Sequence, residues 1–274
     1  MATAKGFQVN DTVLWVEDTG ETNLPAILCL HSLFLDGRMF QQLVEAAAGK
    51  YRVIRPDFRG QGKSAPATTE IVDMDTCASD IAALIEKLKL RSINLIAQSM
   101  GGDVAVRLVS RKQEAFRSMI LLGSSARNEP PDQLEDFRKW VVDACTGGFV
   151  DATLQFTMEI MFGKTTRADP SKQAMLALWR GRIASLPVSL QPAMSGVIER
   201  GDARPLLPLI KIPVLIFSGE EDMPRPPAWA DEVASGLPNA KLVRLSKIGH
   251  SPTLEAPEQV LPQILEFLQN PKID

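Results

Sequence analysis

Short runs of consecutive apolar residues recur along the chain, separated by longer stretches in which apolar residues lie at helical spacing. Because each run is apolar at neighbouring rather than alternate positions, it predicts a strand buried on both faces, as in a parallel sheet. The predicted strands are Thr12–Val16, Ala26–Leu30, Arg52–Arg55, Ile93–Ala97, Met119–Leu122, Val214–Ser218 and Leu242–Leu245.

The stretches between these runs predict helices that pack against the sheet. In Asp75–Leu88, the residues Ile81, Leu84 and Ile85 fall on one face of a helix. The other predicted helices of this kind are Gly37–Ala48, Met100–Arg111 and Pro257–Leu268. Strands that alternate with helices predict an α/β fold built on a mostly parallel, doubly wound sheet.

Residues 128–206 interrupt this alternation, because they carry helical patterns with no strand between them. The predicted helices are Asp132–Cys145, Val150–Met161, Ser171–Ala184 and Val188–Glu199, separated by glycine and proline turn signals. We therefore predict a helical cap, residues 128–206, inserted into a core domain that is formed by residues 1–127 and 207–274.

The composition of the chain argues against several classes of partner and binding site. The net charge of −3 argues against a nucleic-acid partner or an anionic membrane surface, and no apolar stretch is long enough to span a bilayer. The N-terminal residues lack the apolar core of a signal peptide, and the three widely spaced cysteines form neither a disulfide framework nor a zinc pattern. We expect a cytoplasmic protein without a bound metal.

Ser99 is the predicted centre of the chemistry, because it stands between a predicted strand and a predicted helix. The segment Ala97–Gly101 is similar to the nucleophile elbow, usually written G-x-S-x-G, in which the serine sits on a strained turn. The positions two residues before and after the serine must be small, since strand and helix approach closely there. Ala97 and Gly101 meet this requirement.

A base for Ser99 has two candidates, because the chain contains two histidines, His31 and His250. His250 follows the last predicted strand, as the chain order serine, acid, histidine requires. An imidazole at that place would take the serine proton during attack on a carbonyl. His31 ends a strand that precedes Ser99, and we expect it to hold its loop by hydrogen bonds.

The orienting acid is expected after the predicted strand Val214–Ser218, where Glu220, Glu221 and Asp222 stand together. The position three residues after Gly219 favours Asp222, with Glu221 or Glu129 as alternatives. Another glycine-rich segment, Asp57–Ser64, is interpreted as a structured turn in which Asp57 and Arg59 form an ion pair.

Taken together, these motifs resemble the α/β-hydrolase superfamily over nearly the whole chain. A finer resemblance lies in the segment His31–Phe40, whose pattern Ser-Leu-x-x-Asp-x-Arg-Met-aromatic is similar to the 3-oxoadipate enol-lactonase branch. Phe34 differs from the glycine that this branch often carries. In hydrolases of this fold, one backbone N–H of the oxyanion hole follows the corresponding strand and the other follows the nucleophile, which implies Leu33 and Met100 here.

The resemblance implies a cofactor-free serine hydrolase that cleaves a carboxylic ester or lactone of a small, mainly hydrophobic molecule. The alternatives are a hydrolase of an anionic lactone, as in the enol-lactonase branch, a cofactor-free haloperoxidase or perhydrolase, and a ligand receptor without catalysis. Oligomeric state is left open, with a homodimer as one arrangement.

The cap is expected to cover the Ser99 pocket, because it leaves the sheet after Met119–Leu122 at the active-site edge. Its aromatic and methionine residues predict a mainly apolar pocket, with Phe34, Trp140 and Trp179 as substrate contacts. An anionic substrate would need a cationic partner, for which the candidates are Arg38, Arg138 and Arg180.

Overall fold

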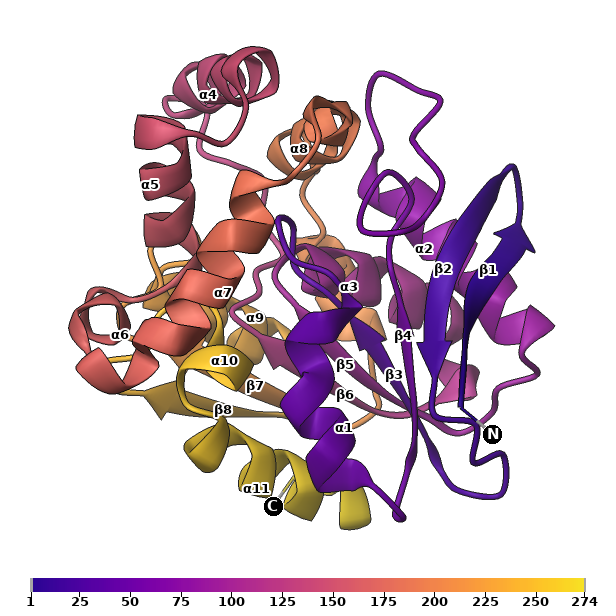
Figure 1. Ribbon diagram of the computed structural model, residues 1–274. Helices are drawn as coiled ribbons and strands as arrows, with labels where there is room; N and C mark the ends of the chain where they lie inside the picture. Colours follow the sequence, from indigo (N-terminus) through magenta and orange to yellow (C-terminus); the bar gives the residue numbers. More distant parts are fainter. Residues whose placement is uncertain (1, 274) are drawn as a thin grey trace.

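The computed structural model describes residues 2–273, in which the strands form an eight-stranded sheet of order β1-β2-β4-β3-β5-β6-β7-β8 (Figure 1). The strands are β1 Thr3–Val9, β2 Thr12–Asp18, β3 Ala26–Leu30, β4 Arg52–Pro56, β5 Ile93–Gln98, β6 Phe116–Leu122, β7 Val214–Gly219 and β8 Ala240–Leu245. Pairing is parallel from β4 through β8, and β1 and β2 add an antiparallel edge. The predicted fold class is confirmed.

Strand β1 is absent from the sequence prediction for a physical reason. All but two of its residues are exposed, so no apolar run marks it. It forms because the chain turns back at Asn10, whose φ is +44°, and pairs along its whole length with β2.

Helices cover both faces of the sheet. Figure 1 shows α1 and α11 on one face and α2, α3 and α9 on the other. Their bounds are α1 Gln41–Ala47, α2 Met74–Lys87, α3 Met100–Lys112, α9 Pro227–Gly236, α10 Pro252–Glu255 and α11 Pro257–Gln269. Helix α9 was not predicted, because only Ala230 and Val233 on it are buried and two residues make too short an apolar stripe.

The chain between β6 and β7 contains helices and no strand. These are α4 Leu134–Gly147, α5 Asp151–Met161, α6 Lys164–Ala168, α7 Gln173–Ala184 and α8 Gln191–Ile198, and Figure 1 shows them gathered together beyond one end of the sheet. The short α6 is an addition to the predicted set. Residues 128–206 are called the cap below and the rest of the chain the core, and the division of the two into separate domains stays a prediction.

Parallel strands bring the candidate site together. Because their carboxyl ends lie at one edge of the sheet, the loops that follow β3, β5, β7 and β8 meet there. Ser99 follows β5, Asp222 follows β7 and His250 follows β8. Within residues 2–273, none of the helices has the length and apolarity that crossing a bilayer requires.

Candidate active site

Ser99 occupies a strained turn between β5 and α3. Its φ is +51° and its ψ is −114°, a backbone conformation that residues other than glycine rarely adopt. The strand and the helix approach so closely that a Cβ at Gly101 would lie 2.3 Å from the carbonyl oxygen of Leu30. This contact explains why the position two residues after Ser99 must be glycine, as the motif requires.

Asp222 is the acid in contact with His250. The Nδ1 atom of His250 lies 2.9 Å from Asp222 Oδ1 and 3.0 Å from Oδ2, and both side chains are buried. Asp222 Oδ1 also accepts a hydrogen bond from the backbone N–H of Arg225. The alternative acids have other partners, since Glu221 accepts from Thr165 and Glu129 pairs with arginines.

The predicted oxyanion donors are the backbone N–H groups of Leu33 and Met100. Neither the amide of Leu33 nor that of Met100 donates to an acceptor among the described residues. Met100 opens helix α3, whose first N–H groups lack intrahelical acceptors. The loop that carries Leu33 is held by His31, whose Nε2 accepts from Phe58 N at 3.0 Å and whose Nδ1 lies 2.8 Å from Ser32 O.

The predicted ion pair between Asp57 and Arg59 is wrong. Asp57 instead accepts hydrogen bonds from the backbone of Gly37 and Lys63, at 3.0 and 2.9 Å. Arg59 pairs with Asp80, which comes from α2 and was too distant in sequence to be recognised. Both residues therefore tie the turn to its surroundings.

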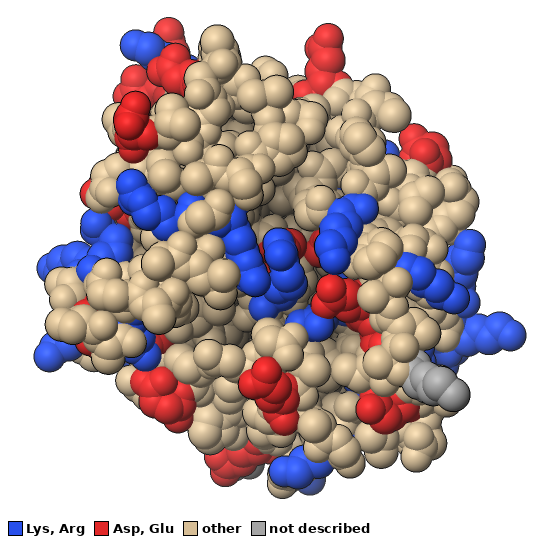
Figure 2. Space-filling model, viewed as in Figure 1, with Lys and Arg blue, Asp and Glu red and all other residues tan. Residues whose placement is uncertain are grey.

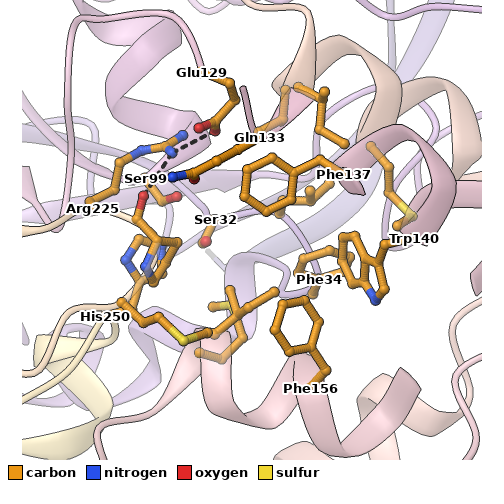
Figure 3. Close-up of a pocket in the computed structure, with 18 residues that line it drawn as sticks. Ser32, Phe34, Ser99, Glu129, Gln133, Phe137, Trp140, Phe156, Arg225 and His250 are labelled. Atoms are coloured by element: carbon orange, nitrogen blue, oxygen red, sulfur yellow. Dashed lines mark hydrogen bonds and ion pairs between the residues drawn. The ribbon is translucent and has the colours of Figure 1, made fainter. Parts of the chain in front are cut away.

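A cavity of about 240 Å³ contains Ser99 and His250 in its lining. Among the described residues no hydrogen bond joins these two side chains, although both face the same space. Figure 3 shows Phe34, Trp140 and Phe156 at one side, with Glu129, Gln133 and Arg225 at the other beside Ser99 and His250. The aromatic rings are in edge contact, with centroids 5.6 Å apart for Phe34–Trp140 and Trp140–Phe156.

Comparison with known proteins shows which family the chain belongs to. Residues 25–257 match the family described as alpha/beta hydrolase fold. The chain belongs to this family. An AB hydrolase superfamily protein of Bacillus subtilis, YisY, is 30% identical over 266 residues, which cover 93% of this chain and 94% of YisY.

Solved structures of two hydrolases are similar along nearly their whole length. A thermophilic esterase from Thermogutta terrifontis is 30% identical with a TM-score of 0.85, and the match covers 98% of both chains. An enol-lactonase from Burkholderia xenovorans LB400 is 26% identical with a TM-score of 0.88, over 97% of this chain and 100% of that chain. The resemblance drawn from the sequence is confirmed.

The structure separates the predicted substrate contacts of this hydrolase. Phe34 and Trp140 line the cavity, whereas Trp179 does not. Trp179 is buried on α7, and the guanidinium of Arg182 lies 4.5 Å from its ring centroid. The apolar residues of α7 predict that Trp179 is buried, but they do not predict which part of the chain buries it. In the structure α7 packs against other parts of the cap, including α5.

None of the predicted arginines lines the cavity with Ser99. Arg38 pairs with Asp36, Arg138 pairs with Glu199, and Arg180 contacts Gln155. Figure 2 shows basic and acidic side chains gathered around a hollow on one face of the molecule. Arg38 lines a neighbouring cavity of about 150 Å³, together with Asp36, Lys63 and Arg182, and Phe34 lines both this cavity and the one that contains Ser99.

The cation that does line the Ser99 cavity is Arg225, which sequence reasoning missed. Arg225 Nη1 lies 3.1 Å from Glu129 Oε1, and Nη2 lies 3.3 Å from Asp103 Oδ2. Arg200 is fully buried and also pairs with Glu129 and Asp103. Burial alone would raise the pKa of Glu129, but the charges of Arg225 and Arg200 outweigh it and hold that pKa below its usual range.

A second buried carboxylate, Glu255, holds the loop that carries His250. Its oxygens accept from the backbone N–H groups of Gly249 and Ser251, on either side of His250, at 3.0 and 2.8 Å. It also accepts from Gly163 N at 2.9 Å and from Thr166 Oγ1 at 2.6 Å, both in the cap. Burial raises the pKa of Glu255, and these hydrogen bonds offset only part of that effect.

Proposed function

We propose that this alpha/beta hydrolase cleaves a carboxylic ester or lactone of a small, mainly hydrophobic molecule with Ser99, His250 and Asp222 as its triad. The observation that carries the proposal is the contact between His250 Nδ1 and both oxygens of Asp222 at the edge of the cavity that Ser99 lines. The aromatic side of that cavity supports an apolar acyl or alcohol group.

In the proposed reaction, Ser99 Oγ attacks the carbonyl carbon while His250 Nε2 takes its proton. Asp222 keeps the other imidazole proton on Nδ1 and stabilises the imidazolium. The amides of Leu33 and Met100 donate to the oxyanion. His250 then returns the proton to the leaving alkoxide, and the same steps with water in place of Ser99 release the acid and restore the serine.

The proposal is tested by Ser99→Ala with p-nitrophenyl butyrate as substrate. We expect kcat to fall by about 10⁴-fold or more, since residual activity would come only from the oxyanion donors and binding. A fluorophosphonate probe should label the wild type and leave Ser99→Ala unlabelled. Ser124→Ala is the matched control, because Ser124 is also buried but does not line the cavity.

Undiminished turnover by Ser99→Ala would show that Ser99 is not the nucleophile. A wild-type protein that binds esters but neither turns them over nor reacts with the probe would instead be a receptor on the hydrolase fold.

A further inference from the structure

One side of the Ser99 cavity presents two polar groups that the protein itself leaves unused. Glu129 receives both arginines on the same oxygen, Oε1, and its second oxygen has no hydrogen-bond partner among the described residues. The side-chain amide of Gln133, an exposed residue at the cavity, has no such partner within residues 2–273 either. Both residues line the cavity and lie together beside Ser99 and His250 (Figure 3).

These groups are complementary to a neutral hydroxyl. The pKa of Glu129 lies below its usual range, so its free oxygen is an ionised acceptor that can take a hydroxyl proton. The Gln133 amide can donate to the oxygen of the same hydroxyl. The acceptor and the donor therefore lie on one side of the cavity, and the aromatic rings of Phe34, Trp140 and Phe156 lie on the other.

The charge balance of the same region disfavours an anionic ligand. Arg225 is the cation that lines the cavity, and it already lies between the carboxylates of Glu129 and Asp103. With Arg200, the buried group contains two positive and two negative side chains. A substrate carboxylate would add a negative charge that no unpaired cation of the cavity lining balances, and a buried charge without a partner is costly.

We propose that Glu129 and Gln133 bind a hydroxyl carried close to the scissile carbonyl, so that the substrate is a neutral hydroxy ester or hydroxy lactone with an apolar remainder. This inference rests on the proposed serine hydrolase and decides against the anionic lactone. The hydroxyl donates to Glu129 and accepts from Gln133, while the apolar remainder lies against the aromatic rings.

The test compares three methyl esters with the same six-carbon acyl chain: methyl hexanoate, methyl 3-hydroxyhexanoate and monomethyl adipate. Acid release gives kcat/KM for each. The hydroxy ester should exceed methyl hexanoate by about tenfold, the size of effect that a hydrogen bond to a charged group produces. Monomethyl adipate, which is anionic, should be the poorest of the three.

Two variants trace the preference to its residues. Glu129→Gln keeps the shape but removes the charge, and should reduce the hydroxyl preference severalfold while improving the relative rate with monomethyl adipate. Gln133→Leu, at an exposed position, should lower kcat/KM for the hydroxy ester more than for methyl hexanoate. Glu199→Gln, a cap glutamate outside the cavity lining, is the control that should leave the ratio unchanged.

The inference fails if the wild type treats the esters alike, if it prefers monomethyl adipate, or if the hydroxyl preference survives in Gln133→Leu. A misfolded Glu129→Gln, detected by lost probe labelling at Ser99, leaves Gln133→Leu to decide. If no ester is cleaved and the probe does not label Ser99, the proposed hydrolase itself fails, and this inference fails with it.

Discussion

Two buried glutamates join the cap of this hydrolase to its core, and the protein satisfies them in opposite ways. Glu129 faces two arginines, whereas Glu255 accepts four hydrogen bonds from neutral N–H and O–H groups. The pKa of Glu129 is lowered and that of Glu255 is raised. Glu255 is the more deeply buried of the two and has neutral partners, whereas Glu129 has charged ones, so burial and the charge of the partners both contribute to the difference.

This difference shows what each contact can contribute. At Glu129 the charges of the arginines outweigh the loss of hydration, whereas at Glu255 the neutral hydrogen-bond donors offset only part of it. Glu255 therefore gives less stability than its four hydrogen bonds suggest. What it does provide is geometry, because its partners include the amides on either side of His250.

The largest effect on stability is expected for Glu129→Leu. Removing this carboxylate leaves Arg200 and Arg225 buried with Asp103 as their shared partner. Breaking a buried pair in this way costs about 3–5 kcal/mol. Urea unfolding measures it, and a loss below that of Glu255→Leu would show that the arginines are not what separates the two glutamates.

A smaller loss of stability, about 1–3 kcal/mol, is expected for Glu255→Gln. The NH₂ group of the new glutamine would face a backbone N–H group that now donates to the carboxylate, so that two donors would meet. Its effect on catalysis should be larger than its effect on binding. Displacement of the His250 loop should lower kcat about tenfold and leave KM nearly unchanged. Steady-state kinetics decide this, and equal changes in kcat and 1/KM would argue against a positioning role for Glu255.

The contributions of the two glutamates to the free energy of unfolding should change with pH in opposite directions. For Glu255, the raised pKa means that the folded protein binds the proton more tightly than the unfolded chain. Its contribution to stability therefore falls as pH rises from the ordinary glutamate pKa to the raised one. For Glu129, the lowered pKa means that its contribution is present above the ordinary glutamate pKa and is lost as pH falls through the lowered value.

The measurement is the unfolding free energy of wild type minus that of Glu255→Gln or Glu129→Gln, from acid to neutral pH. The first difference should decrease as pH rises and the second should increase. A tenfold difference in proton affinity between the folded and the unfolded protein changes the unfolding free energy by about 1.4 kcal/mol. Slopes of the same sign would contradict the comparison.

The smallest effect is expected for Glu221→Gln. Glu221 also binds the cap, through Thr165 N and Oγ1, but this contact is exposed to solvent. We expect a change in stability within about 0.5 kcal/mol and nearly normal kcat. Thermal unfolding is sufficient to measure it, and a loss as large as that of Glu255→Gln would mean that burial does not distinguish the two contacts.

The sequence predicts the parts of this structure that depend on local pattern. Strands β2 to β8 are marked by apolar runs, and the order of Ser99, Asp222 and His250 follows from where those runs end. Strand β1 could not be found in this way, because its pairing with β2, not its burial, stabilises it.

The cavity wall was only partly predictable, since it depends on contacts between residues far apart in the chain. Arg225 meets Glu129 across 96 positions and Asp103 across 122. Trp140 and Trp179 both belong to apolar helical patterns, yet one faces the cavity and the other is enclosed by its neighbours. A stripe on one helix indicates which residues are buried, but the placement of the next helix decides what buries them.

The close approach of Gly163 to Gly249 restricts how this enzyme can be remodelled. A Cβ on Gly249 would lie 2.1 Å from the backbone nitrogen of Gly163, and one on Gly163 would lie 2.8 Å from that of Gly249. A chimera that imports the cap of another hydrolase must therefore bring a glycine to this crossing, whatever substrate it is meant to accept. Libraries aimed at new specificity should leave these two positions constant.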